Sequence, residues 1–207
     1  MKYSLFHNFL QEDEKFAVID YVNTINHKSK ADNVHLSHLI DKIRGNSHMY
    51  DISKTEITKE ITSFQSGGND VMKEELPQVF HSLIDRISET INLPLSNSFL
   101  QIVDMDKGGI IGGHYDAASD GYINYKCNIS VLAEDYDFTI DSETLNIKEG
   151  DLYCFEASLY KHWTNKPFTS RRILLSFGFM LPYETLARTI NDPRVRLSRR
   201  IKRIFQH

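Results

Sequence analysis

The spacing of apolar residues changes near residue 95, and this change does most to limit the folds open to the chain. Before residue 95, apolar side chains recur every three or four residues, which places them on one face of a helix. After it, short apolar runs alternate with turn-forming Asp, Asn and Gly, which is typical of short β-strands. We therefore expect a helical part followed by a β-sheet part.

Two segments of the first part have clear helical spacing. Their predicted apolar faces are Phe16, Ile19, Val22 and Ile25 in one segment, and Val79, Leu83, Ile87 and Ile91 in the other. Pro77 suits the first turn of the second helix, where a missing backbone N–H leaves nothing unpaired. A weaker helical pattern covers 34–44, and 45–70 is expected to be loop with one short helix at 58–64.

The second part predicts several short strands, at 98–104, 124–134, 137–141, 151–157 and 172–180. Short strands at close spacing are typical of a sandwich or a small barrel. The expected fold class is α+β, with a mainly antiparallel β core and N-terminal helices covering one sheet face. A chain of 207 residues is about one domain. We expect a helical support region at 1–95, the β core at 96–181 and a basic tail at 182–207.

Composition excludes several classes of protein. Hydrophobic residues make up 41% of the chain, enough for a packed core rather than wholesale disorder. No apolar run approaches the roughly 20 residues of a membrane span, and the first residues turn acidic too soon for a signal peptide. We therefore expect a cytoplasmic protein. Cys127 and Cys154 are expected to be buried free thiols, because their spacing fits no zinc knuckle or redox pair.

Charge gives little support to nucleic-acid binding, since the formal net charge is −4. It is unevenly distributed, because residues 188–207 carry seven Arg or Lys and a single acidic residue, Asp192. Such a tail could bind an acidic partner or lie across the acidic remainder of its own chain. We expect the second, because a short charge run is usually a solvated face. The oligomeric state stays open.

The candidate site begins at His114-Tyr115-Asp116, where residues two apart on a strand would point the same way. Acidic residues are common enough here that about one such pair is expected by chance, so the pair alone decides nothing. Further along, the strand-like segment 150–155 leads to His162, and Arg172 opens the apolar strand 172–180. Two His and one carboxylate form a metal face suited to Fe(II). An Arg fork suits a carboxylate ligand.

The chain resembles the 2-oxoglutarate- and Fe(II)-dependent oxygenases, especially their prolyl-hydroxylase-like branch. The resemblance lies in an ordered pattern: His-x-Asp, then a Gly-Asp-aromatic strand, then His, and then Arg about one strand later. The match covers roughly 98–181, and the segment 6–14 (FHNFLQEDE) looks like the strand-then-helix opening of that branch. The resemblance implies a double-stranded β-helix (jelly-roll) core buttressed by the N-terminal helices.

The resemblance also assigns roles to residues. His114, Asp116 and His162 would bind Fe(II), and Arg172 would bind the distal carboxylate of 2-oxoglutarate with Ser176 as a hydroxyl partner. The implied cofactors are Fe(II), 2-oxoglutarate and O₂. Arg171 could take the role of Arg172, but only one of them can. Arg172 is favoured because the apolar strand begins straight after it and its face includes Ser176.

The implied activity is that of a dioxygenase, a hydroxylase acting on a C–H bond of an amino-acid-like small molecule or a peptide side chain, with release of succinate and CO₂. Asp116 favours hydroxylation or desaturation over halogenation. The chain departs from the family at Asp104 and Met105, where a Tyr is common, and at 137–145, where a Gly-Gly-Glu-Leu-like turn is common. The substrate therefore stays open. The alternative is a non-catalytic or 2-oxoglutarate-independent, cupin-like β-barrel binding protein.

One face of the strand at 124–134 should look into the barrel. Lys126 and Asn128 alternate there with Cys127 and Ile129, so either pair could face inward. Tyr115, Tyr122, Tyr125 and Trp163 could line a substrate pocket or be ordinary aromatic residues of the β core. The sequence decides neither question.

Overall fold

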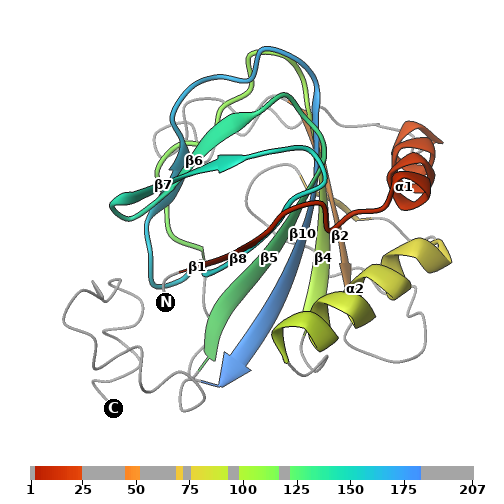
Figure 1. Ribbon diagram of the computed structural model, residues 1–207, viewed down its shortest axis with the longest axis horizontal. Coiled ribbons are helices and arrows are strands. Elements are labelled where there is room, and N and C mark those ends of the chain that lie inside the picture. Colours follow the sequence, from red (N-terminus) through yellow and green to blue (C-terminus); the bar gives the residue numbers. More distant parts are fainter. Residues whose placement is uncertain are drawn as a thin grey trace.

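In the part of the chain that the structure describes, ten strands form two sheets and two helices accompany them (Figure 1). The computed structural model describes residues 3–24, 45–51, 69–71, 76–92, 98–116 and 122–182. The predictions for 34–44, for the short helix at 58–64 and for the tail beyond residue 182 lie outside these residues.

The larger sheet has seven strands. In spatial order they are β1 (Tyr3–Phe6), β8 (Leu152–Glu156), β5 (Tyr122–Leu132), β10 (Arg172–Pro182), β4 (Ser98–Met105), β2 (Gly45–Asp51) and β3 (Asn69–Val71). All neighbours pair antiparallel except β2 and β3. The smaller sheet is antiparallel, in the order β7 (Glu143–Ile147), β6 (Tyr136–Ile140) and β9 (His162–Thr164). The expected mainly antiparallel β core is confirmed.

Alternation along the strands gives the larger sheet two different faces. The Phe138 ring on β6 lies 5.0 Å from the Tyr153 ring and 5.5 Å from the Phe155 ring, measured between centroids, so these β8 side chains face the smaller sheet. Tyr153 is opposite Asn128 and Phe155 is opposite Lys126. Cross-strand partners share a face, so Lys126 and Asn128 also face the smaller sheet. We call this the inner face.

The opposite, outer face is apolar. Its buried residues on β5 and β10 include Cys127, Ile129, Val131, Ile173, Leu175 and Phe177, and they belong to one apolar cluster with the buried residues of the helices. In Figure 1 the two helices lie on one side of the larger sheet and β6 and β7 on the other. Cys127 and Cys154 are opposite each other in the β5–β8 pair and are buried free thiols, as expected.

Helix α1 (Glu12–Thr24) begins with three acidic residues, which suit the positive end of the helix dipole. It buries Val18 and Val22, whereas Phe16 is 63% exposed. The prediction that Phe16 belongs to the buried face was therefore wrong, because the buried stripe is set by Val18 and Val22, one turn apart.

Helix α2 (Gln78–Ile91) follows Pro77 directly, in agreement with the predicted start. It buries Phe80, Leu83, Ile84 and Ile87. No helix in the described part of the chain is both long and apolar enough to cross a membrane.

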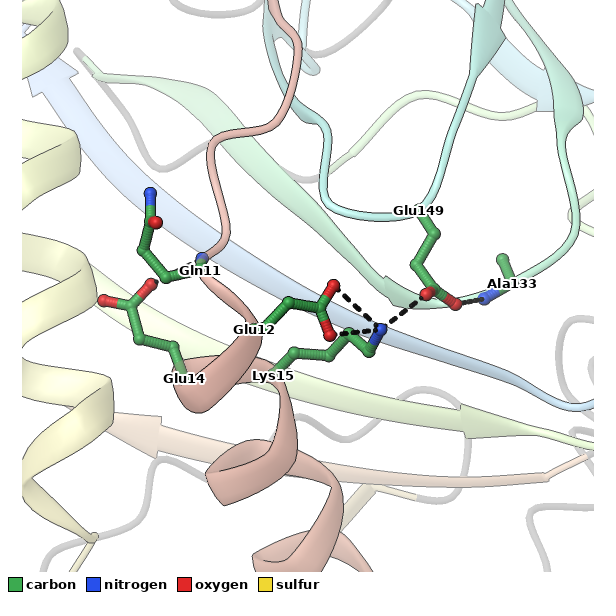
Figure 2. Close-up of polar contacts among 6 residues, drawn as sticks. All are labelled: Gln11, Glu12, Glu14, Lys15, Ala133 and Glu149. Carbon is green, nitrogen blue, oxygen red and sulfur yellow. Dashed lines mark hydrogen bonds and ion pairs between the residues drawn. The ribbon is translucent and has the colours of Figure 1, made fainter.

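Helix α1 is attached to the β core by the contacts drawn in Figure 2. Lys15 Nζ lies 2.8 Å from Glu149 Oε1, in the β7–β8 turn, and 3.0 Å from Glu12 Oε2. The hydrogen bonds to Glu149 and Glu12 raise the pKa of Lys15. The Ala133 N–H, which follows β5, donates to Glu149 Oε2 at 3.4 Å. Lys15 and Glu149 therefore join the start of the helix to two connections of the β core.

The first half of the chain contributes more than helices. Strand β1 matches the expected strand-then-helix opening. Strands β2 and β3 lie within 45–70, so the prediction of loop was wrong for these two segments. Strand β2 pairs with β4 along the sheet, and this backbone pairing holds a segment whose sequence, GNSHMYD, lacks an apolar alternation.

We predict that Leu83→Ala lowers the free energy of unfolding by about 2–5 kcal/mol, because it opens a cavity beneath α2. Phe16→Ala should change it by no more than about 0.5 kcal/mol, because that ring is exposed. Urea unfolding followed by circular dichroism measures both. Equal losses for the two variants would show that the buried face of the helices has been assigned wrongly.

Candidate metal centre

His114, Asp116 and His162 come together on the inner side of the β core. His114 Nε2 lies 3.3 Å from Asp116 Oδ1, and His162 Nε2 lies 3.6 Å from the same oxygen. One potential ligand atom from each residue lies within 4.8 Å of the others. Within the described residues, this is the one group of three or more His, Cys, Asp or Glu side chains arranged in this way.

The backbone brings these residues together. His162 opens β9, and His114 forms an isolated antiparallel bridge with it. The His114 N–H donates to the His162 carbonyl at 3.2 Å, and the His162 N–H donates to the His114 carbonyl at 3.0 Å. The Asp116 N–H donates to the Ala157 carbonyl at 3.0 Å, which fixes the third residue. The cluster is therefore held by main-chain hydrogen bonds from two distant segments.

Hydrogen bonds also set the orientation of both imidazole rings. His114 Nδ1 lies 2.8 Å from the Gly112 carbonyl oxygen, and His162 Nδ1 lies 3.0 Å from the Tyr160 carbonyl oxygen. A carbonyl can only accept, so each Nδ1 carries the hydrogen and each Nε2 lone pair points into the cluster. Such backbone partners are typical of histidines that bind metals.

The charges around the cluster favour an ionised carboxylate. Burial alone would raise the pKa of Asp116, but the Lys126 ammonium and the two neighbouring histidines hold it well below its usual value. Burial is the largest influence on His162 and, with the charge of His114, lowers its pKa. Burial opposes the charged form of His114 too, but the Asp116 carboxylate outweighs it and the pKa is raised.

This donor set is compatible with iron. Two imidazole nitrogens and one carboxylate oxygen on one side of a site leave positions open for other ligands, the arrangement that suits non-haem Fe(II). Apolar rings hold the His162 imidazole in place: its centroid lies 4.8 Å from that of Phe155 and 5.9 Å from that of Phe138. The residues present therefore fit a bound divalent metal.

Arg172, the first residue of β10, is fully buried. Its Nη2 donates to the Tyr136 hydroxyl at 2.9 Å and to the Tyr153 hydroxyl at 3.3 Å, and its Nη1 lies 3.6 Å from Met105 Sδ. The guanidinium carbon lies 4.8 Å from the Tyr136 ring centroid and 4.7 Å from that of Phe168. None of these partners within the described ranges is a carboxylate, and Arg172 Nε has no hydrogen-bond partner among them.

Arg171 differs sharply from its neighbour. Its Nε and Nη2 each lie 2.8 Å from one oxygen of Asp104, and its Nη1 donates to Asn23 Oδ1 at 2.9 Å. The side chain is 39% exposed. Asp104, at the position where the resembled family often has Tyr, thus serves as the partner of Arg171. Of the two adjacent guanidinium groups, one is paired with a carboxylate and the other is buried without one among the residues that the structure describes.

Ser176 lies on the inner face, and its cross-strand partner is Asn128, which is opposite Tyr153. All three residues are buried. The side-chain oxygens Asn128 Oδ1 and Ser130 Oγ are also buried and have no hydrogen-bond partner in the described part of the chain. A polar strip consisting of Lys126, Asn128, Ser130, Tyr153 and Arg172 therefore leads from Asp116 to the buried guanidinium.

Sequence reasoning found the cluster and Arg172 but missed part of their surroundings. Tyr136, Phe168 and Met105 contact Arg172, and Lys126 Nζ lies 3.5 Å from Asp116 Oδ2. The alternation along 124–134 had placed Lys126 in one of the two pairs that could face inward. With Tyr153 included, the Arg172 contacts come from four separate segments, and the sequence carries no local signal for them.

The sequence matches no protein-family model, and no curated protein matches it. Solved structures with a similar fold include the viral collagen prolyl hydroxylase of Paramecium bursaria Chlorella virus-1 in its 2OG complex, with a TM-score of 0.54 and 15% identity over 87% of this chain and 97% of that one. A Pseudomonas putida prolyl-4-hydroxylase has a TM-score of 0.58 and 13% identity over 87% and 92% of the two chains.

A Burkholderia pseudomallei oxidoreductase of the 2OG-Fe(II) oxygenase family has a TM-score of 0.54 and 13% identity, over 86% of this chain and 83% of that one. The resemblance to this superfamily and to its prolyl-hydroxylase-like branch is thus confirmed at the level of the fold. At identities this low, the likeness shows the fold alone.

We predict that His162→Ala weakens binding of Co(II), a stable stand-in for Fe(II), by more than about 100-fold, because it removes one of three ligands. The matched control is His7→Ala, since His7 Nδ1 lies 3.1 Å from Asp151 in a His–carboxylate pair outside the cluster. Isothermal titration calorimetry measures both. An equal loss in the two variants, or none in either, would rule out the cluster as the metal site.

Proposed function

We propose that the protein is an Fe(II)- and 2-oxoglutarate-dependent dioxygenase acting as a hydroxylase. His114, Asp116 and His162 would hold Fe(II), and Arg172, with Ser176, would bind the distal carboxylate of 2-oxoglutarate. The observation that carries the proposal is the fully buried Arg172 guanidinium, which lacks a carboxylate partner among the described residues and lies on the same inner face as the His–Asp–His cluster.

A buried guanidinium without a counter-charge is energetically expensive. Hydroxyl groups and aromatic rings stabilise the charge of Arg172 but do not neutralise it. Arg171, one residue earlier, has the usual solution in its bidentate pair with Asp104. A dicarboxylate ligand would supply the missing partner, and the planar Arg fork matches a carboxylate in geometry. The cost of burying Arg172 is then offset only when the co-substrate is bound.

The polar strip fits the remainder of such a ligand. Asn128 Oδ1 and Ser130 Oγ are buried without partners, so a ligand or water that reaches them satisfies groups that are otherwise unpaired. The Tyr153 hydroxyl accepts from Arg172 and can donate onward to a ligand oxygen. These residues would orient the co-substrate between the guanidinium and the metal cluster, as the geometry of a reacting complex requires.

When bound, Fe(II), 2-oxoglutarate and O₂ supply the oxidation, in which the keto acid becomes succinate and CO₂ and a substrate C–H becomes C–OH. The chain contributes an ionised Asp116, two imidazoles fixed by the Gly112 and Tyr160 carbonyls, and a lining of Phe138 and Phe155 that keeps water from His162. The two sheets would form the two halves of a double-stranded β-helix in a single oxygenase domain, 1–207.

The proposed substrate class is suggested in part by the solved structures with a similar fold. Two of the similar structures are prolyl hydroxylases, and one is described as a collagen prolyl hydroxylase. A small amino-acid-like molecule or a peptide side chain is accordingly the proposed substrate, in the reducing cytoplasm that suits two free thiols. A cupin-like binding protein without catalysis would need no free guanidinium at Arg172, so the experiments below distinguish it from the oxygenase.

We predict that anaerobic addition of Fe(II) and 2-oxoglutarate to the purified protein gives the weak visible charge-transfer band of a metal-chelated keto acid. Arg172→Met should raise the Kd for 2-oxoglutarate by about 10- to 100-fold, because a charge-assisted hydrogen-bond pair is lost. The matched control Arg171→Met removes a guanidinium from the other face and should leave the Kd unchanged. Absence of the band in the wild type, with metal bound, would favour the cupin-like alternative.

We also predict that Arg172→Met leaves the free energy of unfolding of the metal-free protein unchanged within about 1 kcal/mol or raises it, because it removes a buried charge with no counter-charge in the described segments. The Tyr136 and Tyr153 hydroxyls lie 3.3 Å apart and can bond each other after the change. Urea unfolding measures the effect. A loss of about 3–5 kcal/mol would identify Arg172 as a structural residue rather than one kept for ligand binding.

A further inference from the structure

We propose that Lys126 is a positioning residue: it holds Oδ2 of Asp116 by an ion pair, so that Oδ1 alone faces the metal. The inference rests on the proposed metal site. Asp116 Oδ1 lies 3.3 Å from His114 Nε2 and 3.6 Å from His162 Nε2, whereas Oδ2 lies 3.5 Å from Lys126 Nζ. One oxygen is thus among the other candidate ligands, and the second is engaged by a cation.

Lys126 is not a surface lysine that happens to lie nearby. The residue is 6% exposed and sits on the inner face of β5, opposite Phe155, whose ring packs on His162. Burying an ammonium is expensive unless it is paired. Lysines are rarely buried to this degree, and the carboxylate that compensates Lys126 is the one in the candidate metal cluster.

The position of Lys126 is itself supported by two residues of neighbouring strands. Lys126 Nζ lies 4.7 Å from the Phe99 ring centroid, at a distance that suits a cation–π contact. Gly178 lies between Lys126 and Phe99 in the sheet. A Cβ at residue 178 would come within 2.1–2.6 Å of three Phe99 ring atoms, so the ring occupies the space that a side chain would need. Gly178 therefore allows Phe99 to lie against Lys126.

This arrangement matters because a carboxylate can bind a metal through one oxygen or both. With one oxygen, the His–Asp–His set takes three positions and leaves three for other ligands in a six-coordinate site. With both, one of these positions is lost. A cation fixed at Oδ2 opposes the second mode electrostatically and by occupying that oxygen. Orientation of a ligand by its outer partner typically changes metal affinity or activity 10- to 100-fold.

The test is infrared difference spectroscopy of the Co(II)-loaded protein against the metal-free protein, with Asp116→Asn used to assign the Asp116 bands. The antisymmetric and symmetric carboxylate stretches are farther apart when one oxygen binds a metal than when both do. We expect a wide separation in the wild type and in Lys126→Arg, and a narrow one in Lys126→Met. Lys126→Met should also bind 2-oxoglutarate about 10- to 100-fold more weakly with Co(II) present.

Two further variants separate positioning from other effects. Lys161→Met removes an exposed lysine whose Nζ lies 6.0 Å from the Trp163 ring centroid, so it tests the loss of another lysine charge near the cluster and should leave the band separation unchanged. Gly178→Ala should shift the bands in the same direction as Lys126→Met, because it displaces Phe99. Gly178→Ala keeps Lys126 itself, so it tests the arrangement even if Lys126→Met does not fold.

The outcomes are distinct. A separation that is wide in both wild type and Lys126→Met would overturn the positioning role while leaving the metal site intact. A narrow separation in the wild type would overturn it as well. If Co(II) produced no band that depends on Asp116, the proposed metal site would fail, and the role of Lys126 with it.

Discussion

The arrangement of the site depends on one constraint, the alternation of side chains along β5 and β10. Each strand must bury an apolar face under the helices and, with every second residue, build a polar face toward the smaller sheet. Cys127 and Ile129 satisfy the first requirement, and Lys126 and Asn128 satisfy the second. Because strand geometry fixes both sets at once, the apolar packing on the helix side also determines which residues reach the candidate metal centre.

The inner face is unfavourable for stability when considered alone. It buries the Arg172 guanidinium without a carboxylate partner in the described part of the chain, and it leaves Asn128 Oδ1 and Ser130 Oγ unpartnered there. Such groups lower stability unless a ligand or water satisfies them. The outer face offsets this loss, because its side chains are packed with the buried residues of α1 and α2. The apolar packing and the polar groups of the candidate site are thus divided between the two faces of the same sheet.

The sequence predicted those features that depend on local pattern. The apolar runs gave β4, β5, β6, β8 and β10 almost within their observed bounds, and helical spacing with Pro77 gave α2. Strands β2, β3, β7 and β9 were missed, and for β2 and β9 the reason is physical. Strand β9 has three residues, and β2 pairs with β4 without an alternating pattern of its own, so both depend on pairing with distant segments.

The sequence named the residues of the candidate site, but it did not predict how these residues come together. His114, Asp116, His162 and Arg172 stood out by type and order, but the His114–His162 bridge and the contacts of Arg172 require the folded sheets. The facing of Lys126 was undecidable from sequence, because alternation has two solutions that differ by one residue. Only the Phe138 contacts with β8, together with the β5–β8 register, decide between them.

The adjacent arginines show how strictly the strand register determines which side chain lies on the inner face. A shift of β10 by one residue would exchange the two faces of the whole strand. Arg171 would then lie on the inner face, away from Asp104. Phe177 would replace Gly178 in the space that the Phe99 ring occupies. Ile173 and Leu175 would leave the apolar cluster at the same time. The free energy that opposes this shift comes mainly from the outer apolar face, so packing beneath the helices is what places Arg172, rather than Arg171, on the inner face that carries Lys126 and Asn128.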